Sequence, residues 1–217
     1  MPLQGKSVLL AGATGLVGRE CLELLLADPV FTHITALVRR PLPVDQTSTK
    51  LSVQTVDFED LDKRSDLFTV DQIICALGTT IRKAGSQVAF RQVDFYYPLR
   101  IAELGLANGA SHFLLVSSMG ANSQSRVFYS RVKGELEDAI AELHYRAFTV
   151  VHPSVLIGKR TERRLGEEIA KRLAFLTPPR MRPVHAHQVA AALVHAARQD
   201  EPGHRVIDNL RLQSFQL

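Results

Sequence analysis

Three glycines stand three residues apart near the N-terminus, in the stretch VLLAGATGLVGRE (residues 8–20). The apolar run Lys6–Ala11 leads into Gly12, Gly15 and Gly18, and a helical pattern of apolar residues follows them. Glycine is needed in a strand-to-helix turn where the backbone conformation or close packing excludes a side chain. Amide groups at the start of such a helix face outward and attract an anion such as a phosphate. The spacing is therefore typical of a phosphate cradle, with a tightly packed turn as the alternative.

In folds that bind dinucleotides, each of the three glycines has its own role. The first permits the tight turn, the second lets the backbone approach the pyrophosphate, and the third lets the helix pack closely on the sheet. The triplet here follows directly on the first apolar run and opens the first helical pattern, which favours the nucleotide cradle. The residues expected to line it are Gly12, Ala13, Thr14, Gly15, Leu16, Val17 and Gly18.

Two arginines follow the second apolar run, in ALVRRPLP (residues 36–43). In folds that bind NAD, an acidic residue roughly 20 residues beyond the glycines bonds the ribose hydroxyls. Arg39 and Arg40 occupy that place here, and the first acid after them is Asp45. Two guanidinium groups can hold a 2′-phosphate through bidentate hydrogen bonds. They predict NADP(H) rather than NAD as the cofactor, unless they are only solvated charges at a strand end.

Two later strand ends fit the same nucleotide. VDFED places Asp57 and Phe58 where an adenine would lie, as a hydrogen-bond acceptor and an apolar wall. Asp57 could equally cap the helix that follows. CALGTT places Leu77, Gly78 and Thr79 at the end of the fourth apolar run, where the backbone must pass close to the cofactor.

A tyrosine and a lysine lie one helical turn apart in FYSRVKGE, as Tyr129 and Lys133, and therefore share a helix face. Tyrosine, with an ordinary pKa of about 10, is a poor acid–base group at neutral pH, but a lysine ammonium beside it favours the phenolate. The same ammonium can hold the ribose of a nicotinamide nucleotide. Ser117 and Ser118 end the preceding apolar run, which brings a hydroxyl into the same cleft. Together these residues predict a site that can hold and protonate a carbonyl oxygen.

Eight stretches, in order along most of residues 7–158, resemble a known family. The chain resembles the short-chain dehydrogenases/reductases of the atypical class, and among them the Tat-interacting-protein-2 (CC3) family. The order of the stretches makes this resemblance far more specific than any one motif. The stretches are GATGLVGRE, LVRRP, VDFEDLD, CALGTTIRKAG, VDFYYP, HFLLVSSMGA, FYSRVKGELE and HPSVLIG.

The resemblance implies a Rossmann-like fold, NADPH bound at the glycine loop and the two arginines, and a small carbonyl substrate. Ser118 would position the carbonyl, Tyr129 would donate the proton, and Lys133 would hold the ribose and assist the tyrosine. Pro153 and Val155 would border the nicotinamide.

Two departures from the family pattern limit what can be carried over. The gap between Ser118 and Tyr129 is short, so Ser117 is an alternative for the catalytic serine and a cofactor contact. His152 stands where many relatives have an arginine before the proline, either as a substrate contact or as a structural histidine.

Short apolar runs that alternate with helical patterns must position these residues. Such alternation predicts right-handed βαβ units, and therefore an α/β, Rossmann-like, doubly wound parallel sheet with a small C-terminal substrate-side cap. We expect one domain, 1–217, with its core in 1–157 and the cap region in 158–217, where residues 158–183 carry many Arg and Lys residues and a helical pattern. The expected strands are Lys6–Ala11, His33–Val38, Leu51–Asp57, Gln72–Leu77, His112–Ser117 and Ala147–Val151; the expected helices are Gly15–Ala27, Leu61–Phe68, Val88–Asn108 and Tyr129–Leu143.

Composition bounds the partners. The net charge of +4 is mild and predicts no nucleic acid as partner. No apolar run approaches the roughly 18 residues of a membrane span, and no secretory signal pattern is present. The two cysteines, Cys21 and Cys75, fall in apolar patterns and read as reduced core residues, which predicts a cytoplasmic protein. No cluster of Cys, His and Asp predicts a metal site.

Two functions remain open from the sequence. The first is an NADPH-dependent reductase of a carbonyl substrate, either a monomer or a homodimer. The second is a non-catalytic NADPH-binding protein whose cofactor state controls contact with a protein partner, since the resembled family includes binding proteins without an established reaction. Only the first needs the hydroxyl of Tyr129.

Overall fold

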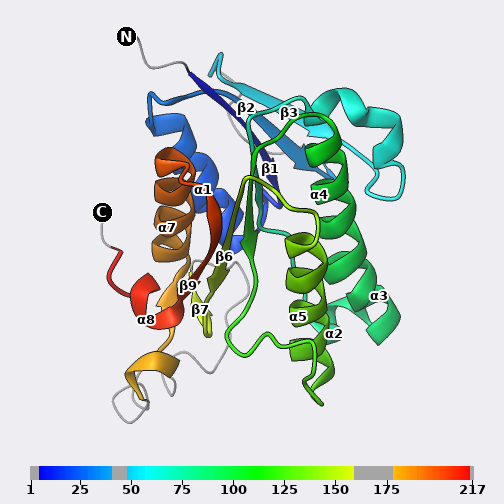
Figure 1. The fold of residues 1–217 in the computed structure, drawn as a ribbon, viewed down its shortest axis with the longest axis vertical. Helices are drawn as coiled ribbons and strands as arrows, with labels where there is room; N and C mark the ends of the chain where they lie inside the picture. The colour runs from blue at the N-terminus through cyan, green and yellow to red at the C-terminus, as the bar shows by residue number, and fades with distance from the viewer. Residues whose placement is uncertain (1–4, 41–47, 159–177, 216–217) are drawn as a thin grey trace.

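Seven parallel strands form one sheet through the middle of the protein (Figure 1). The structure is a computed structural model that describes residues 5–40, 48–158 and 178–215. The strand order is β3-β2-β1-β4-β5-β6-β9, which reverses direction at β1 and is the doubly wound order of dinucleotide-binding folds. The strands are β1 (Lys6–Ala11), β2 (Phe31–Val38), β3 (Leu51–Thr55), β4 (Gln72–Cys75), β5 (His112–Val116), β6 (Ala147–His152) and β9 (Gly203–Asp208).

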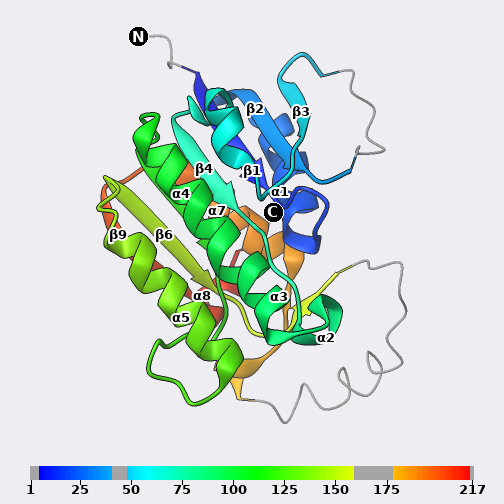
Figure 2. The ribbon, with the colours of Figure 1, turned by 90° about the vertical axis from the view of Figure 1, so that its right-hand side faces the viewer.

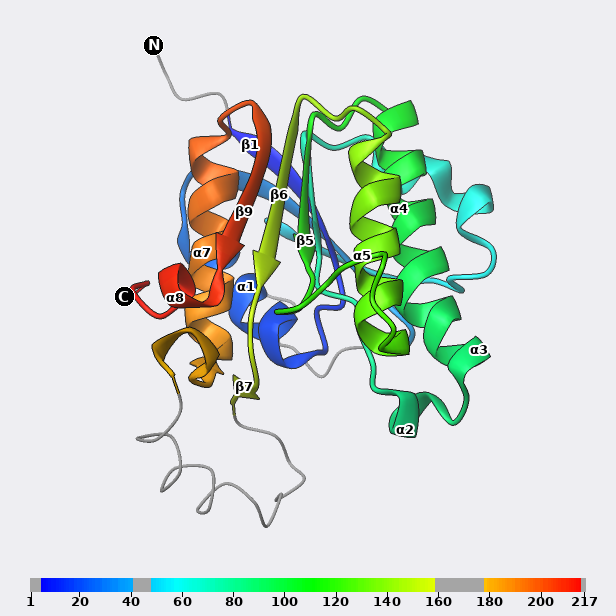
Figure 3. The ribbon, with the colours of Figure 1, turned by 60° about the horizontal axis from the view of Figure 1, so that its bottom comes forward.

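Helices cover both faces of this sheet (Figure 3). Alternate residues of a strand point to opposite faces, so Val8 and Leu10 of β1 pack in one apolar cluster while Leu9 and Ala11 pack in the other. Figure 2 shows one of the two faces, where the helices α4 and α5 lie side by side. The first face is covered by α1 (Leu16–Ala27) and α7 (Ala186–Gln199), and the second by α4 (Tyr97–Ala107) and α5 (Phe128–Ala141).

The six strands expected from the sequence all form, and the fold class is confirmed. Two of the expected helices differ in kind. Leu61–Phe68 is a 3-10 helix, η1, with a non-helical residue at Arg64. The expected helix Val88–Asn108 is three segments, because a π-helical turn, η2 (Gln92–Tyr96), separates α3 (Gln87–Arg91) from α4.

Part of the region expected as a cap, 158–217, packs with the sheet core that was expected in 1–157. Helix α7 packs on α1, and β9 pairs with β6 along its whole length. The sequence concealed β9 because an edge strand needs no continuous apolar run, and most of its side chains are exposed. Residues 159–177, most of the basic segment, lie outside the described residues. The other short elements are α2 (Ile81–Ala84), β7 (Leu156–Ile157), η4 (Pro179–Met181), β8 (Val184–His185) and α8 (Asn209–Leu212).

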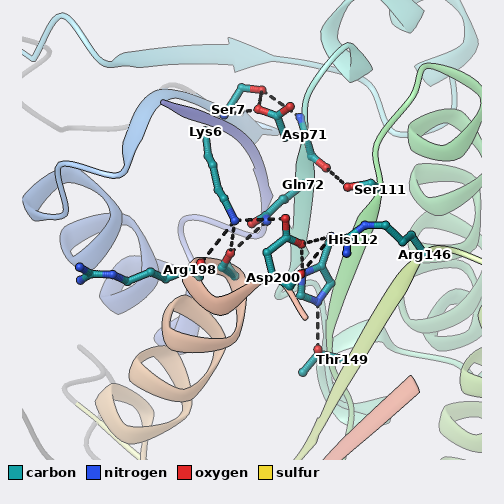
Figure 4. A network of polar contacts seen from close by, with 11 residues as sticks. Lys6, Ser7, Asp71, Gln72, Ser111, His112, Arg146, Thr149, Arg198 and Asp200 are labelled. Atoms are coloured by element: carbon teal, nitrogen blue, oxygen red, sulfur yellow. Dashed lines mark hydrogen bonds and ion pairs between the residues drawn. The ribbon is translucent and has the colours of Figure 1, made fainter. Parts of the chain in front are cut away.

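A polar network ties together the amino ends of the strands, at the edge of the sheet away from the glycine loop (Figure 4). Asp200, just after α7, accepts from Lys6 at 3.1 Å and also pairs with Arg146. The buried ring of His112 lies between Asp200 Oδ1, 3.1 Å from Nδ1, and Thr149 Oγ1, 2.9 Å from Nε2. A neutral ring satisfies both contacts, with Nδ1 donating to the carboxylate and the Thr149 hydroxyl donating to Nε2. The network therefore joins α7 to the sheet.

This network predicts that the protein loses stability in mild acid. Burial lowers the pKa of His112 from 6.5 to about 4, more than the neighbouring Asp200 carboxylate raises it. The unfolded chain therefore binds a proton more readily than the folded one, so the stabilising effect is complete above pH 6.5 and is lost as the pH falls toward 4. We expect this group to lower the free energy of unfolding by about 3 kcal/mol between pH 7 and pH 4, measured by urea denaturation.

The variant His112→Gln should be less stable at pH 7 but should lose much of this pH dependence. His33, which is exposed on β2, provides the matched control, and His33→Gln should keep the slope of the unmodified chain. An unchanged slope in His112→Gln would show that another group is responsible.

Candidate functional site

The carboxyl ends of the parallel strands meet at one edge of the sheet, at the bottom of Figures 1 and 3. In doubly wound sheets, ligands bind at this edge, near the point where the strand order reverses. The sequence-predicted site residues follow the ends of β1, β2, β3, β4, β5 and β6, apart from Tyr129 and Lys133 on α5. The fold thus gathers residues that are far apart in the sequence.

The glycine loop is shaped by its lack of side chains. Gly12 has φ +89°, and a Cβ there would lie 2.6 Å from the backbone of Ala76 in the neighbouring strand end. A Cβ on Gly18 would lie 2.0 Å from Gly12 O, so α1 packs directly on the loop. Gly15 is the N-cap of α1 and donates from its N–H to Gly12 O at 2.9 Å.

The start of α1 is open to an anion. No side chain caps this twelve-residue helix, and no acidic residue lies in its first turn. Thr14 and Gly15 are exposed, whereas Ala13 and Val17 pack into the core, so the latter two offer backbone rather than side-chain contacts. The amides and the positive end of the helix dipole suit a phosphate. The residues present therefore fit a nucleotide.

The residues expected at the adenosine half lie around this loop. Arg39 and Arg40 follow β2 with exposed side chains. The Asp57 carboxylate accepts from Glu59 N at 3.0 Å, which closes a local turn; the N-cap of the following η1 is Asp60, so Asp57 is not its cap. Phe58 is buried, with its ring 5.5 Å from that of Tyr97.

A buried ion pair lies beside the loop that follows β4. Lys133 Nζ lies 2.8 Å from Asp94 Oδ1, and the two side chains are only 4% and 1% exposed. The other oxygen, Asp94 Oδ2, accepts from Thr79 N at 2.8 Å. A Cβ on Gly78 would lie 3.5 Å from Asp94 Oδ1 and 3.9 Å from Lys133 Nζ, so the pair lies directly against this backbone. The ion pair therefore links α5, which carries Tyr129 and Lys133, to the loop after β4.

Asp94 was missed by the reasoning from sequence. It lies in η2 within VDFYYP, which carries part of the family resemblance, but a single carboxylate in a helix has no spacing that indicates a role. Its partner Lys133 comes from a different helix, 39 positions further along the chain. Only the folded arrangement brings the two together.

Tyr129 lies on α5, one turn before Lys133. Its ring is 5.4 Å from that of Phe90 on α3, measured between centroids. Burial works against the charge of Lys133, but Asp94 and then Tyr129 outweigh it and raise the pKa of the ammonium group above its ordinary value. The lysine is therefore charged at neutral pH.

The two serines after β5 have different surroundings. The Ser117 hydroxyl donates to Glu137 Oε1 on α5, and the same carboxylate lies 3.0 Å from His152 Nε2. Ser118 is also buried, but its hydroxyl has no hydrogen-bond partner among the described residues. Ser117 and His152 are thus occupied by a structural contact, and Ser118 has a hydroxyl free to meet a ligand.

The segment after β6 closes the described part of the site. Pro153 is buried, and its carbonyl accepts from Met119 N at 2.9 Å, which fixes the loop after Ser118. Val155 is 68% exposed. Glu137, which holds Ser117, was also missed from sequence, because nothing in its spacing along α5 indicates a partner just after β5.

Comparison with known proteins identifies the family. A family described as NAD(P)H-binding matches residues 12–200. The chain belongs to this NAD(P)H-binding family. Protein HTATIP2 of Rattus norvegicus is 39% identical over 172 residues, which cover 78% of this chain and 71% of that protein. The resemblance to the Tat-interacting-protein-2 (CC3) family is confirmed.

Solved structures of the same fold support the architecture of the NAD(P)H-binding family. MoeE5 in complex with UDP-glucose and NAD is similar with a TM-score of 0.71 and 17% identity, over 93% of this chain and 75% of that one. UDP-glucose 4-epimerase from Thermotoga maritima has a TM-score of 0.71 and 13% identity, over 93% and 76% of the two chains.

The expected cytoplasmic location is contradicted by fungal relatives in the family. A Candida albicans relative, 33% identical over 204 residues that cover 89% of this chain and 88% of that one, is named Protein FMP52, mitochondrial. Relatives from Emericella nidulans and Scheffersomyces stipitis carry mitochondrial names as well. The prediction failed because reduced cysteines and the lack of a secretory pattern do not distinguish cytoplasm from mitochondrion.

The described residues form neither a membrane-spanning helix nor a cluster of metal ligands. None of their helices has the length and apolar character needed to cross a membrane. Nor do three His, Cys, Asp or Glu side chains within the described ranges come together as ligands for a metal ion.

Proposed function

We propose that the chain is an NADP(H)-dependent oxidoreductase that reduces a small carbonyl compound. Two observations support the proposal: Lys133 is buried beside Asp94, one helical turn from Tyr129, and the buried Ser118 hydroxyl has no hydrogen-bond partner among the described residues. A buried hydroxyl without a partner is costly, and a substrate oxygen would satisfy it.

The side chains divide the work on the carbonyl as follows. Ser118 donates a hydrogen bond to the carbonyl oxygen and fixes its position. The nicotinamide, when bound, supplies the hydride for the carbonyl carbon. Tyr129 gives its phenol proton to the oxygen as negative charge develops there, and the Lys133 ammonium stabilises the resulting phenolate. Among the three side chains, only Lys133 carries a charge before the reduction, and only Tyr129 changes its charge during it.

The nucleotide would lie along the carboxyl edge of the sheet. The open start of α1 and the glycines around it suit the pyrophosphate, and Arg39 and Arg40 suit a 2′-phosphate. Residues expected around the adenine and the nicotinamide are Asp57, Phe58, Leu77, Gly78, Thr79, Ser117, Tyr129, Lys133, Pro153 and Val155.

The cofactor assignment predicts a selective loss of affinity. In the double variant Arg39→Ala/Arg40→Ala, NADPH should bind roughly ten- to a hundredfold more weakly, because one or two charge-assisted hydrogen bonds to the 2′-phosphate disappear. NADH lacks that phosphate and should bind almost as before. Isothermal titration calorimetry measures both affinities.

An exposed arginine on α8 serves as the control. Arg211→Ala removes one exposed arginine that is not among the residues expected to hold the nucleotide, and it should leave both affinities unchanged. Equal affinity of the unmodified chain for NADPH and NADH would contradict the assignment of NADP(H).

A further inference from the structure

Lys133 and its partner Asp94 are both almost completely enclosed by the protein. The side chain of Lys133 is 4% exposed and that of Asp94 is 1% exposed, with 2.8 Å between Nζ and Oδ1. The ammonium group and the carboxylate therefore form a close ion pair that is almost completely shielded from water.

A π-helical turn places Asp94 beside Lys133. Asp94 is the middle residue of the π-helical turn η2, and it is fully buried, while Tyr96, two residues later, is half exposed. A π-helical turn is rare, costs regular hydrogen bonding and is frequent at functional sites. Because Asp94 Oδ2 also accepts from Thr79 N, the carboxylate is fixed at both oxygens between α5 and the loop after β4.

A buried lysine keeps its charge only when a group of opposite charge lies beside it. Removal from water disfavours the charged form of lysine, and for fully buried lysines this can shift the pKa down by several units. Burial is the strongest influence on the pKa of Lys133, and it acts downward; Asp94 is the strongest of the influences that reverse it.

We propose that Asp94 is a positioning residue that keeps Lys133 in its ammonium form and holds it against the backbone of Gly78 and Thr79. The catalytic consequence rests on the proposed function, because Lys133 must be charged to stabilise the phenolate of Tyr129. The charge state itself does not depend on any reaction.

The groups that face Lys133 are few. Asp94 faces it from η2, Tyr129 from its own helix, and Cys75 from the end of β4. Burial raises the pKa of the Cys75 thiol to about 11, so Cys75 stays neutral below that pH. Asp94 is therefore the only carboxylate among these three groups.

The variant Asp94→Asn separates charge from hydrogen bonding. Its amide oxygen can still accept from Thr79 N, but its side chain carries no charge. Burial then dominates at Lys133, and the ammonium group should lose its proton as the pH rises through the neutral range. The resonance of an isotope-labelled lysine ε-carbon reports this charge state directly, and Lys133→Met identifies the signal.

The expected result is a shift of at least about two pH units. In the unmodified chain the Lys133 signal should stay in its ammonium position at every pH at which the protein is folded, and in Asp94→Asn it should titrate well below that. Asp94→Glu should restore the charged form in part. Asp138→Asn removes an exposed carboxylate from the same helix and should change nothing. An identical titration in Asp94→Asn and the unmodified chain would overturn the inference.

Two further results keep the test decisive. If Asp94→Asn does not fold, the double variant Asp94→Leu/Lys133→Met should fold, because it removes both charges together; failure of that variant to fold better than Asp94→Asn would also overturn the inference. In an active enzyme, kcat of Asp94→Asn should fall as the pH rises from about 6 to 9, while that of the unmodified chain stays level over this range.

The inference and the proposed function can fail separately. A shifted titration in a chain that reduces no carbonyl compound supports the role of Asp94 and removes the proposed function. An unshifted titration of Lys133 in a chain that does reduce carbonyl compounds supports the proposed function and removes the role of Asp94.

Discussion

Replacement of Tyr129 by phenylalanine is expected to lower kcat for carbonyl reduction roughly a hundred- to ten-thousandfold, because the group that protonates the carbonyl oxygen is lost. The ring contact with Phe90 remains, so the fold and the affinity for the nucleotide should be nearly unchanged. The rate of NADPH oxidation with a panel of carbonyl compounds measures kcat, and calorimetry measures the affinity for NADPH.

The serines provide a matched pair for this experiment. Ser118→Ala should lower turnover with little effect on stability, because the hydroxyl has no hydrogen-bond partner among the described residues. Ser117→Ala should lower stability, by about 1–3 kcal/mol, because it leaves the partly buried carboxylate of Glu137 with one contact fewer. Full turnover in both Tyr129→Phe and Ser118→Ala would rule out the reductase.

Replacement of Gly12 by alanine should abolish nucleotide binding and also cost roughly 2–4 kcal/mol of stability. The φ of +89° disfavours any side chain, and the new Cβ would lie 2.6 Å from the backbone of Ala76. The three nearest atoms all belong to the backbone of Ala76 and Leu77, so no flexible side chain can move aside and the loop itself must shift away from the phosphate position. Urea denaturation and calorimetry with NADPH measure the two effects.

A substitution at Gly109 serves as a control that separates the effect of backbone strain from the effect of the steric clash with Ala76. Gly109 has a similar φ of +94°, but a Cβ there would meet nothing within 4 Å. Gly109→Ala should therefore lose stability through strain alone and bind NADPH normally. Gly15→Ala, with an ordinary φ and a closest contact of 3.2 Å to Gly12 O, should be far milder than Gly12→Ala in stability. Unimpaired binding by Gly12→Ala would show that the loop does not hold the nucleotide.

The strands that could be predicted from sequence are those buried on both faces. β1, β4 and β5 appear as continuous apolar runs because helices cover both of their faces, and such runs are visible in the sequence alone. β9 lies at the edge, where half-exposed side chains are tolerated, and its place beside β6 depends on a contact between distant parts of the chain.

The candidate site divides in the same way. Gly12, Gly18, Tyr129 and Lys133 could be predicted because local spacing along one turn or one helix already implies their geometry. Asp94 could not, because its meaning lies in an ion pair between η2 and α5 and in a π-helical turn that no pattern of apolar residues indicates. The partner of Ser117 was likewise beyond local reasoning, since it is Glu137 of α5, twenty residues further along the chain.

The transfer of a labelled hydride tests the central claim most directly. NADPH deuterated at C4 of the nicotinamide is incubated with the purified chain and a panel of small carbonyl compounds, and the products are examined by mass spectrometry. The proposed function predicts an alcohol that carries deuterium on the former carbonyl carbon, formed by the unmodified chain and almost absent with Tyr129→Phe. Tight binding of NADPH without deuterium transfer to any carbonyl compound would contradict it and would leave a nucleotide-binding protein without reductase activity.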